Sequence, residues 1–331
     1  MQSIVTSNIG YPRIGENREW KKTLERYWAG KLEKSQFENE MLSLRLRHLQ
    51  KQKDRGVDLI PVGDFSLYDH MLDMAAMFGL VPSRFEYEGG PVPLDVYFAM
   101  ARGNEAAAAC EMTKWFNTNY HYIVPELEQA RPKLVENKPL HAYREAKREL
   151  GIDGKPVIIG PYTFLKLSKG LEPEQLEEAL WMLAPLYEQI LSELQQEGAQ
   201  WVQIDEPALV NTASKEDINR VGEVYRKLQQ AAPQIQIMLQ TYFESLEHAV
   251  EVMQWPVQAI GLDFVHGKEG NMQALAAHGF PEDKLLAVGL IDGRNVWRSD
   301  LSAKRELLQE LARFVPYERM ILQPSCSLLH V

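Results

Sequence analysis

Carboxylates, a thiol and an imidazole follow the apolar runs of this 331-residue sequence, at points where they could act together. Asp205 and Glu206 follow the run WVQI, Asp263 and His266 lie in GLDFVHG, and Cys326 follows ILQPS. In retaining glycosidases two carboxylates flank the scissile bond, one as acid and one as nucleophile. Glu206, with Asp263 two strands further on, is therefore one candidate catalytic pair.

Two observations weigh against a glycosidase. Sugar-binding sites stack their substrates on aromatic rings, and the strand-end loops offer only Tyr242, Phe243 and Phe264. Loops that follow strands are polar in any barrel, and aspartates often cap the helices after them, so the carboxylates also have a purely structural explanation.

Basic residues gather in two segments of an otherwise acidic chain. Lys and Arg number 36 against 46 Asp and Glu, which gives a net charge of -10 and disfavours nucleic acid or an anionic membrane as a general partner. Helical spacing puts Arg18 and Lys21 on one face, where two cations repel unless an anion bridges them. The alternative is a solvated helix face on which these cations balance the negative charges of Glu16 and Glu19. The two segments are YPRIGENREWKK, with Arg13, Arg18, Lys21 and Lys22, and EMTKWFNTNYHY, with Lys114.

Short β-rich runs alternate with helical stretches along the whole chain. Strict alternation predicts a parallel sheet, and about eight such units favour an α/β fold of the (β/α)8 TIM-barrel type with extra N-terminal helices, in one domain over residues 1–331. Segment 120–124 is the surplus candidate, since it could also be an extended loop across the barrel mouth. The nine strand candidates are 4–9, 57–62, 120–124, 156–160, 201–205, 235–242, 259–265, 285–290 and 320–323; segments 36–53 and 173–197 are predicted helices.

The cysteine content and the absence of certain motifs indicate the cellular compartment and argue against a dinucleotide cofactor. Only two cysteines occur, Cys110 and Cys326, and they form no CxxC pattern, so a reducing compartment is expected. No signal peptide or membrane span is apparent, and the prediction is a cytoplasmic protein. No G-x-G-x-x-G follows an early strand, so a dinucleotide fold has no support.

Long motifs carry a family resemblance over nearly the whole chain, from about residue 7 to residue 330. YPRIG with REWKK, LIPVGDFSLYDH, EMTKWFNTNYHYIVPEL, WVQIDEPAL, GLIDGRNVWRSDL and SCSLLH occur in this order. They resemble the N-terminal half of cobalamin-independent methionine synthases. That family transfers the methyl group of 5-methyltetrahydropteroyltri-L-glutamate to L-homocysteine, which forms L-methionine.

The resemblance implies a division of labour between two similar barrels. The second, C-terminal barrel, which is absent from this chain, would hold a zinc ion through His, Cys, Glu and Cys. The N-terminal half would bind the glutamate tail of the folate, at positions that match Arg18, Glu19, Trp20, Lys21 and Lys114. No catalytic residue and no metal ligand is expected in this chain, and the chain alone is expected to be inactive.

An overlay of the two related barrels extends this expectation to zinc. The ligand positions of the catalytic barrel fall on Gln240, Tyr242, Asp263 and Cys326. Glutamine is a poor zinc ligand and tyrosine an uncommon one, so at most two ligands of the tetrahedral set remain. A free-standing barrel that binds without chemistry is the alternative function, and the length of the reading frame would separate the two.

Overall fold

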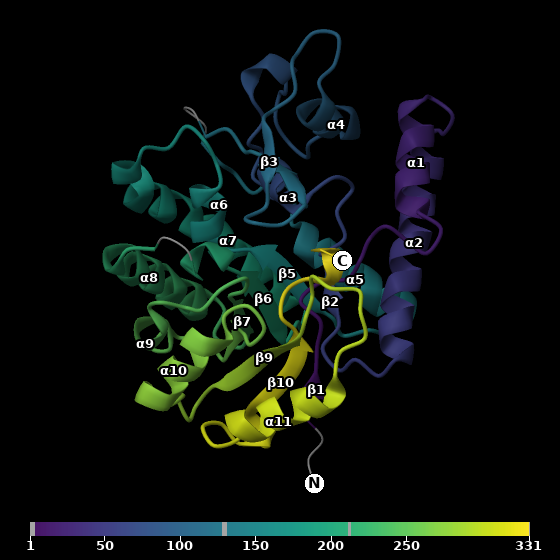
Figure 1. The fold of residues 1–331 in the computed structure, drawn as a ribbon. Helices are drawn as coiled ribbons and strands as arrows, with labels where there is room; N and C mark the ends of the chain where they lie inside the picture. The colour runs from purple at the N-terminus through teal and green to yellow at the C-terminus, as the bar shows by residue number, and fades with distance from the viewer. Residues whose placement is uncertain (1–3, 128–130, 211–212, 331) are drawn as a thin grey trace.

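The computed structural model describes residues 4–127, 131–210 and 213–330, and the strands within them form a parallel barrel (Figure 1). Eight strands pair in the order β1-β10-β9-β8-β7-β6-β5-β2. A parallel bridge between Ser7 and Leu59 joins the two outer strands, so the sheet closes on itself. The predicted (β/α)8 fold is confirmed. The barrel strands are β1 Val5–Thr6, β2 Pro61–Val62, β5 Lys155–Ile159, β6 Trp201–Asp205, β7 Gln236–Gln240, β8 Ala259–Asp263, β9 Leu285–Ile291 and β10 Met320–Pro324.

The strands form where apolar runs are covered on both faces. β8 is buried at every residue, as expected for a parallel strand with side chains inside the barrel and helices outside. β1 and β2 are shorter than the predicted segments 4–9 and 57–62. One reason is that the Asp58 carboxylate accepts hydrogen bonds from the amide (2.8 Å) and hydroxyl (2.8 Å) of Thr6, and so replaces part of the ladder.

Helices surround the barrel, and two of them precede β2. α1 Glu19–Trp28 and α2 Lys34–Asp54 pack together on one side of the molecule, which confirms the extra N-terminal helices (Figure 1). The predicted helix 173–197 is a short 3-10 turn followed by α7 Leu176–Gln196. In the described parts of the chain, no helix has both the length and the apolar character needed to cross a bilayer. The other helices are α3 His70–Met77, α4 Leu94–Arg102, α5 Lys138–Leu150, α6 Pro161–Lys166, α8 Lys215–Ala231, α9 Ala249–Val252, α10 Lys268–His278 and α11 Leu301–Leu311.

Segment 120–124 is neither a barrel strand nor a loop. Its residues His121–Ile123 form β4, which pairs in antiparallel register with β3, Met112–Lys114, in a separate hairpin. The Asp69 carboxylate fixes this hairpin, because it caps α3 and also accepts the amide of Ile123 at 3.0 Å. The hairpin carries Lys114 and so places one predicted site residue on an element outside the barrel.

Candidate functional site

The strand-end carboxylates lie at the barrel mouth, but several of them are bonded to the protein itself. Asp205 accepts hydrogen bonds from the Gln203 amide at 2.7 Å and from the Tyr242 hydroxyl at 3.2 Å. Burial raises the pKa of Asp205 to about 7, although both hydrogen bonds act to lower it. Burial likewise raises the pKa of Asp64, whose carboxylate accepts the Tyr11 amide at 2.7 Å, to about 6.

Glu206 is a structural residue. It is fully buried, and its two carboxylate oxygens accept the amides of Tyr162 at 3.1 Å and Thr163 at 2.7 Å, at the start of α6. The carboxyl group lies so close to Gly160 that a Cβ there would overlap it. Glu206 thus fills the space that a larger residue at the N-cap of α6 would need.

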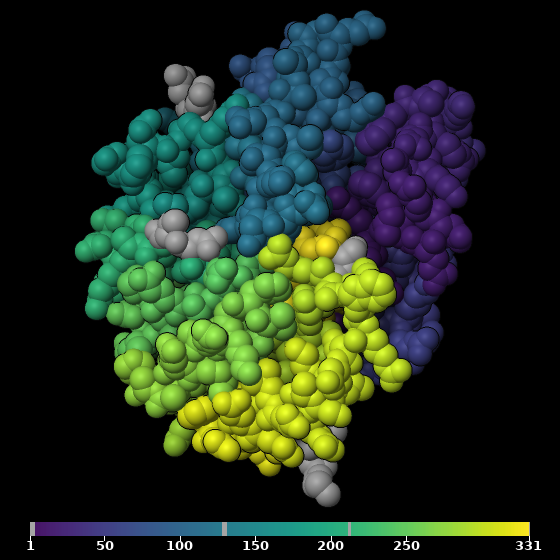
Figure 2. Space-filling model, viewed as in Figure 1, coloured from purple at the N-terminus to yellow at the C-terminus, as the bar shows by residue number. Residues whose placement is uncertain are grey.

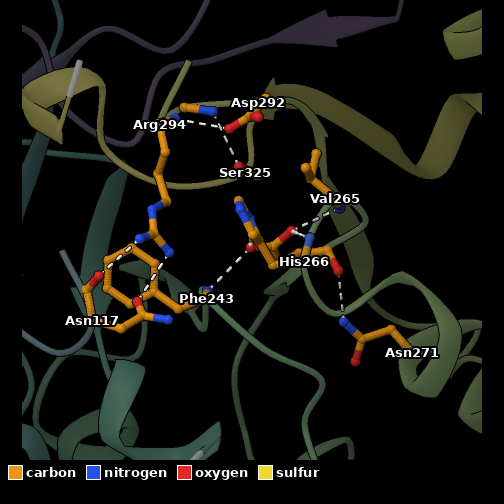
Figure 3. A network of polar contacts seen from close by, with 10 residues as sticks. Asn117, Phe243, Val265, His266, Asn271, Asp292, Arg294 and Ser325 are labelled. Carbon is orange, nitrogen blue, oxygen red and sulfur yellow. Dashed lines mark hydrogen bonds and ion pairs between the residues drawn. The ribbon is translucent and has the colours of Figure 1, made fainter.

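The carboxylate of Asp263 also accepts hydrogen bonds from backbone amides. One oxygen accepts the amides of Val265 at 2.7 Å and His266 at 2.8 Å, and the other accepts the amide of Phe243 at 3.1 Å (Figure 3). An acid and a nucleophile must reach a sugar, and neither Glu206 nor Asp263 is exposed. The glycosidase alternative is therefore wrong.

The four positions that overlay the zinc ligands do not fit a zinc ion. Gln240 and Gln323 exchange two amide hydrogen bonds, at 3.0 and 2.9 Å, across the barrel interior. Tyr242 is bonded to a carboxylate, and burial raises the pKa of the Cys326 thiol to about 12. Zinc binds the thiolate, so this thiol is held in the wrong form. Residues 4–127, 131–210 and 213–330 contain no group of three or more His, Cys, Asp or Glu arranged for a metal.

The predicted basic residues lie at the start of α1 and on β3. Arg18 precedes α1 in the left-handed conformation, with φ of 61°, and its side chain is exposed. Lys21 is exposed in the first turn and lies 3.6 Å from Glu25. Lys114 is exposed on β3, and among the described residues it has no ion-pair partner. Arg18 and Lys114 are thus open to a ligand, and Lys21 is exposed beside Glu25.

Glu19 and Trp20 have roles within the fold. The Glu19 carboxylate accepts the amide of Asn17 at 2.8 Å and lies 3.9 Å from Arg47, and backbone hydrogen bonds lower its pKa. It therefore orders the turn before α1. The Trp20 indole donates to the Ser66 carbonyl at 3.0 Å, which fixes the ring against the barrel.

Arg13 joins the two basic segments, a role that sequence reasoning missed. Its guanidinium lies 4.5 Å from the Trp20 ring and 5.3 Å from the Tyr120 ring, and it donates to the Tyr120 hydroxyl at 3.3 Å. In Figure 2 the purple surface of the N-terminal segment adjoins the blue surface around the hairpin. The YPRIG motif contained the residue, but nothing in its spacing indicated stacking on two distant rings.

A second arginine holds the hairpin on its other side. Arg294 donates to the side-chain and backbone oxygens of Asn117, both at 2.9 Å, and lies 5.5 Å from the Phe243 ring (Figure 3). Asn117 lies in the hairpin turn, and Arg294 lies in the loop after β9. The turn is therefore fastened to the barrel mouth by contacts from two separate loops.

A cavity at the mouth lies beside these contacts. Its lining includes residues that the sequence analysis did not select, His70, Lys138 and His330. One nitrogen of each histidine ring is buried without a hydrogen-bond partner in the described protein, and burial lowers the pKa of His330 to about 4 and that of His70 well below 6.5. Both rings are therefore neutral and add no positive charge beside Lys114 and the two arginines that contact the hairpin.

Comparison with known proteins agrees with the fold and identifies the family. A family described as cobalamin-independent synthase, N-terminal domain, matches residues 5–316. A 5-methyltetrahydropteroyltriglutamate–homocysteine methyltransferase of Halalkalibacterium halodurans is 56% identical over 99% of this chain, and one of Listeria monocytogenes is 55% identical over 100%. The chain spans 43% of the length of either relative.

Two solved structures share the architecture. A B12-independent methionine synthase from a Shewanella species has a TM-score of 0.71 at 14% identity, over 99% of this chain and 92% of that one. A putative vitamin-B12 independent methionine synthase from Listeria monocytogenes has a TM-score of 0.68 at 13% identity, over 98% of this chain and 93% of that one. At these identities the likeness shows the fold, whereas the family match and the relatives above 50% identity show the kinship. The chain belongs to the cobalamin-independent synthase family and corresponds to its N-terminal domain.

Proposed function

We propose that this chain is the folate-binding half of a methyltransferase that converts L-homocysteine and 5-methyltetrahydropteroyltri-L-glutamate into L-methionine. The relatives that carry this name are more than half identical to it over its whole length. A second, C-terminal barrel would occupy the length that the chain does not match, and its zinc would hold homocysteine as a thiolate. The cytoplasm is the proposed location, since Cys110 and Cys326 are both free and buried.

The observation that supports the tail-binding role is the meeting of two basic segments in an acidic protein. Arg18 and Lys21 at the start of α1 and Lys114 on β3 are exposed cations, and Arg13 connects the elements that carry them. A glutamate tail presents several carboxylates along a flexible chain. Cations on two fixed elements can bind such a ligand at more than one point, whereas a single cation cannot.

Glu19 and Trp20 would support this site indirectly. A carboxylate does not attract a carboxylate, so Glu19 contributes by ordering the turn from which α1 starts. Trp20 fixes the helix against the barrel through Ser66. No catalytic residue is proposed in this chain, whose residues would bind and orient the folate while the chemistry proceeds at the second barrel.

Replacing Lys114 by Ala in the complete enzyme is expected to raise the KM for the triglutamate substrate about tenfold, with kcat nearly unchanged. Contacts far from the reacting nitrogen bind the ground state and the transition state alike, and tenfold corresponds to about 1.4 kcal/mol. Arg18→Ala is expected to behave in the same way. Steady-state kinetics test this, with Lys227→Ala on the exposed face of α8 as the matched control. A fall of kcat by orders of magnitude at constant KM would contradict the tail-binding role.

Salt is expected to weaken the preference for long tails. The proposed contacts are exposed ion pairs, which dissolved salt screens over about 8–10 Å at physiological ionic strength. The affinity ratio between triglutamate and monoglutamate folates should therefore fall as ionic strength rises. Binding measured for both ligands at several salt concentrations tests this, and equal affinities at low salt would show that the tail makes no ion pairs here.

A further inference from the structure

Arg13 connects the two basic segments, but the function proposed so far gives it no part in distinguishing long folate tails from short ones. Arg13 is 9% exposed and pairs with no carboxylate among the residues that the structure describes, which is unusual for a charged side chain buried to this extent. In the described part of the chain its contacts are with the rings of Trp20 and Tyr120 and with the Tyr120 hydroxyl. A planar guanidinium can stack on aromatic faces on both of its sides, and an ammonium cannot.

Each of the two rings is tied to one of the proposed tail-binding elements. Trp20 belongs to α1, directly before Lys21, and its indole is held from its other end by the Ser66 carbonyl. Tyr120 accepts the amide of Trp115 at its backbone oxygen, at 2.8 Å, and Trp115 directly follows Lys114. Arg13 therefore contacts Trp20, which is next to Lys21, and Tyr120, which is hydrogen-bonded to the residue next to Lys114.

We propose that Arg13 is a positioning residue that sets the separation of the two groups of cations and so determines selectivity for polyglutamate tails. This inference rests on the proposed function. Several carboxylates on one tail are bound together only if the cations already stand at the right distance. Without Arg13, the hairpin and α1 lose their shared contact, and part of the binding free energy is lost in ordering them.

The test uses Arg13→Gln and Arg13→Lys in the complete enzyme. Gln removes the charge and Lys keeps it, but neither restores stacking on two rings. Both are expected to raise the KM for the triglutamate folate about fivefold, with kcat unchanged and with unchanged affinity for the monoglutamate, which cannot reach both groups. When either variant is combined with Lys114→Ala, the fold-increase in KM should be smaller than the product of the two single fold-increases. The reason is that both substitutions weaken the binding of the same glutamate tail.

A matched control exists at the other end of α1. Arg102 lies 3.9 Å from the Trp28 ring, so it makes a similar stacking contact away from the basic residues. Arg102→Gln is expected to leave the KM for both folates unchanged. Thermal unfolding of every variant shows whether it is folded, and Arg13→Lys decides the result should Arg13→Gln unfold.

The possible results distinguish the proposed role of Arg13 from the proposed binding of the glutamate tail. If Lys114→Ala and Arg18→Ala raise KM while both Arg13 variants leave it unchanged, the positioning role is wrong and the tail-binding role stands. An equal rise for triglutamate and monoglutamate folates would show a general structural role for Arg13, which also overturns the inference. If none of these variants changes KM, the tail-binding site itself is wrong.

Discussion

Purified by itself, this chain is expected to form no methionine from homocysteine and methyltetrahydrofolate triglutamate, and to retain no stoichiometric zinc after dialysis against a chelator. A catalytic zinc site needs three protein ligands and one open position. Here the positions of the overlay hold an amide that is hydrogen-bonded to Gln323 and a phenol that is hydrogen-bonded to Asp205. The other two positions hold a carboxylate that accepts three backbone amides and a thiol whose pKa is raised to about 12. Deprotonating that thiol for a metal would cost more than it does in an exposed cysteine.

Metal analysis after dialysis, followed by zinc titration and an assay for methionine, measures this directly. A zinc ion at this mouth would have to be held by Asp263, His266 and Cys326, and His266 lies 3.5 Å from the Asp263 carboxylate. Cys326→Ser is the informative variant. Stoichiometric zinc that survives dialysis in the native chain and is lost in Cys326→Ser would show a working metal site, and methionine formation by this chain alone would overturn the division of labour between two barrels.

Replacing Glu206 by Ala is expected to lower the free energy of unfolding by about 2–4 kcal/mol, a large part of the stability of a typical domain. The change leaves two buried amides, of Tyr162 and Thr163, without an acceptor, and the hydroxyl of Tyr225, 3.4 Å away, loses its contact. Chemical denaturation of the chain measures the loss. Glu244→Ala is the matched control, because this exposed glutamate follows the neighbouring strand and should change stability by less than about 0.5 kcal/mol.

Glu206→Gln adds a test of the charge state. Burial raises the pKa of Glu206 from 4.5 to about 7, so the folded chain keeps a proton that the unfolded chain releases at lower pH. As pH rises from about 4.5 to about 7, the contribution of Glu206 to the free energy of unfolding falls. Since glutamine does not titrate, the stability difference between the native chain and this variant should narrow over that interval. A difference that widens would show that Glu206 is ionised in the fold.

Much of the fold could be predicted because parallel barrel strands have a plain signature. β9 is apolar throughout and β8 is apolar up to its final Asp263, and the predicted segments match both strands to within a few residues. β3 was missed because all three of its residues, Met112–Lys114, are exposed, so no apolar pattern marks it. The pairing of β3 with β4 depends on contacts made by Asp69, which the local sequence does not reveal.

The candidate site could be predicted only in part, for a similar reason. Residue type and family resemblance select Arg18, Lys21 and Lys114, and these prove to be exposed cations. The same reasoning allowed Glu206 and Asp263 as a catalytic pair, because a sequence does not show that backbone amides occupy a carboxylate. Contacts between distant segments, such as that of Arg13 with Tyr120, come from tertiary packing alone.

The way in which the barrel closes has a consequence for the order of folding. β1 pairs with β10, where Val5 lies opposite Ile321, and its other neighbour is reached through the single bridge between Ser7 and Leu59. β1 is synthesised before the other strands of this barrel, yet its ladder can form only after β10, the last of them, has been synthesised. Contacts between such distant segments are slow to form, because a long loop must close before they contribute. Until β10 is in place, the growing sheet has unpaired strand edges, which favour aggregation.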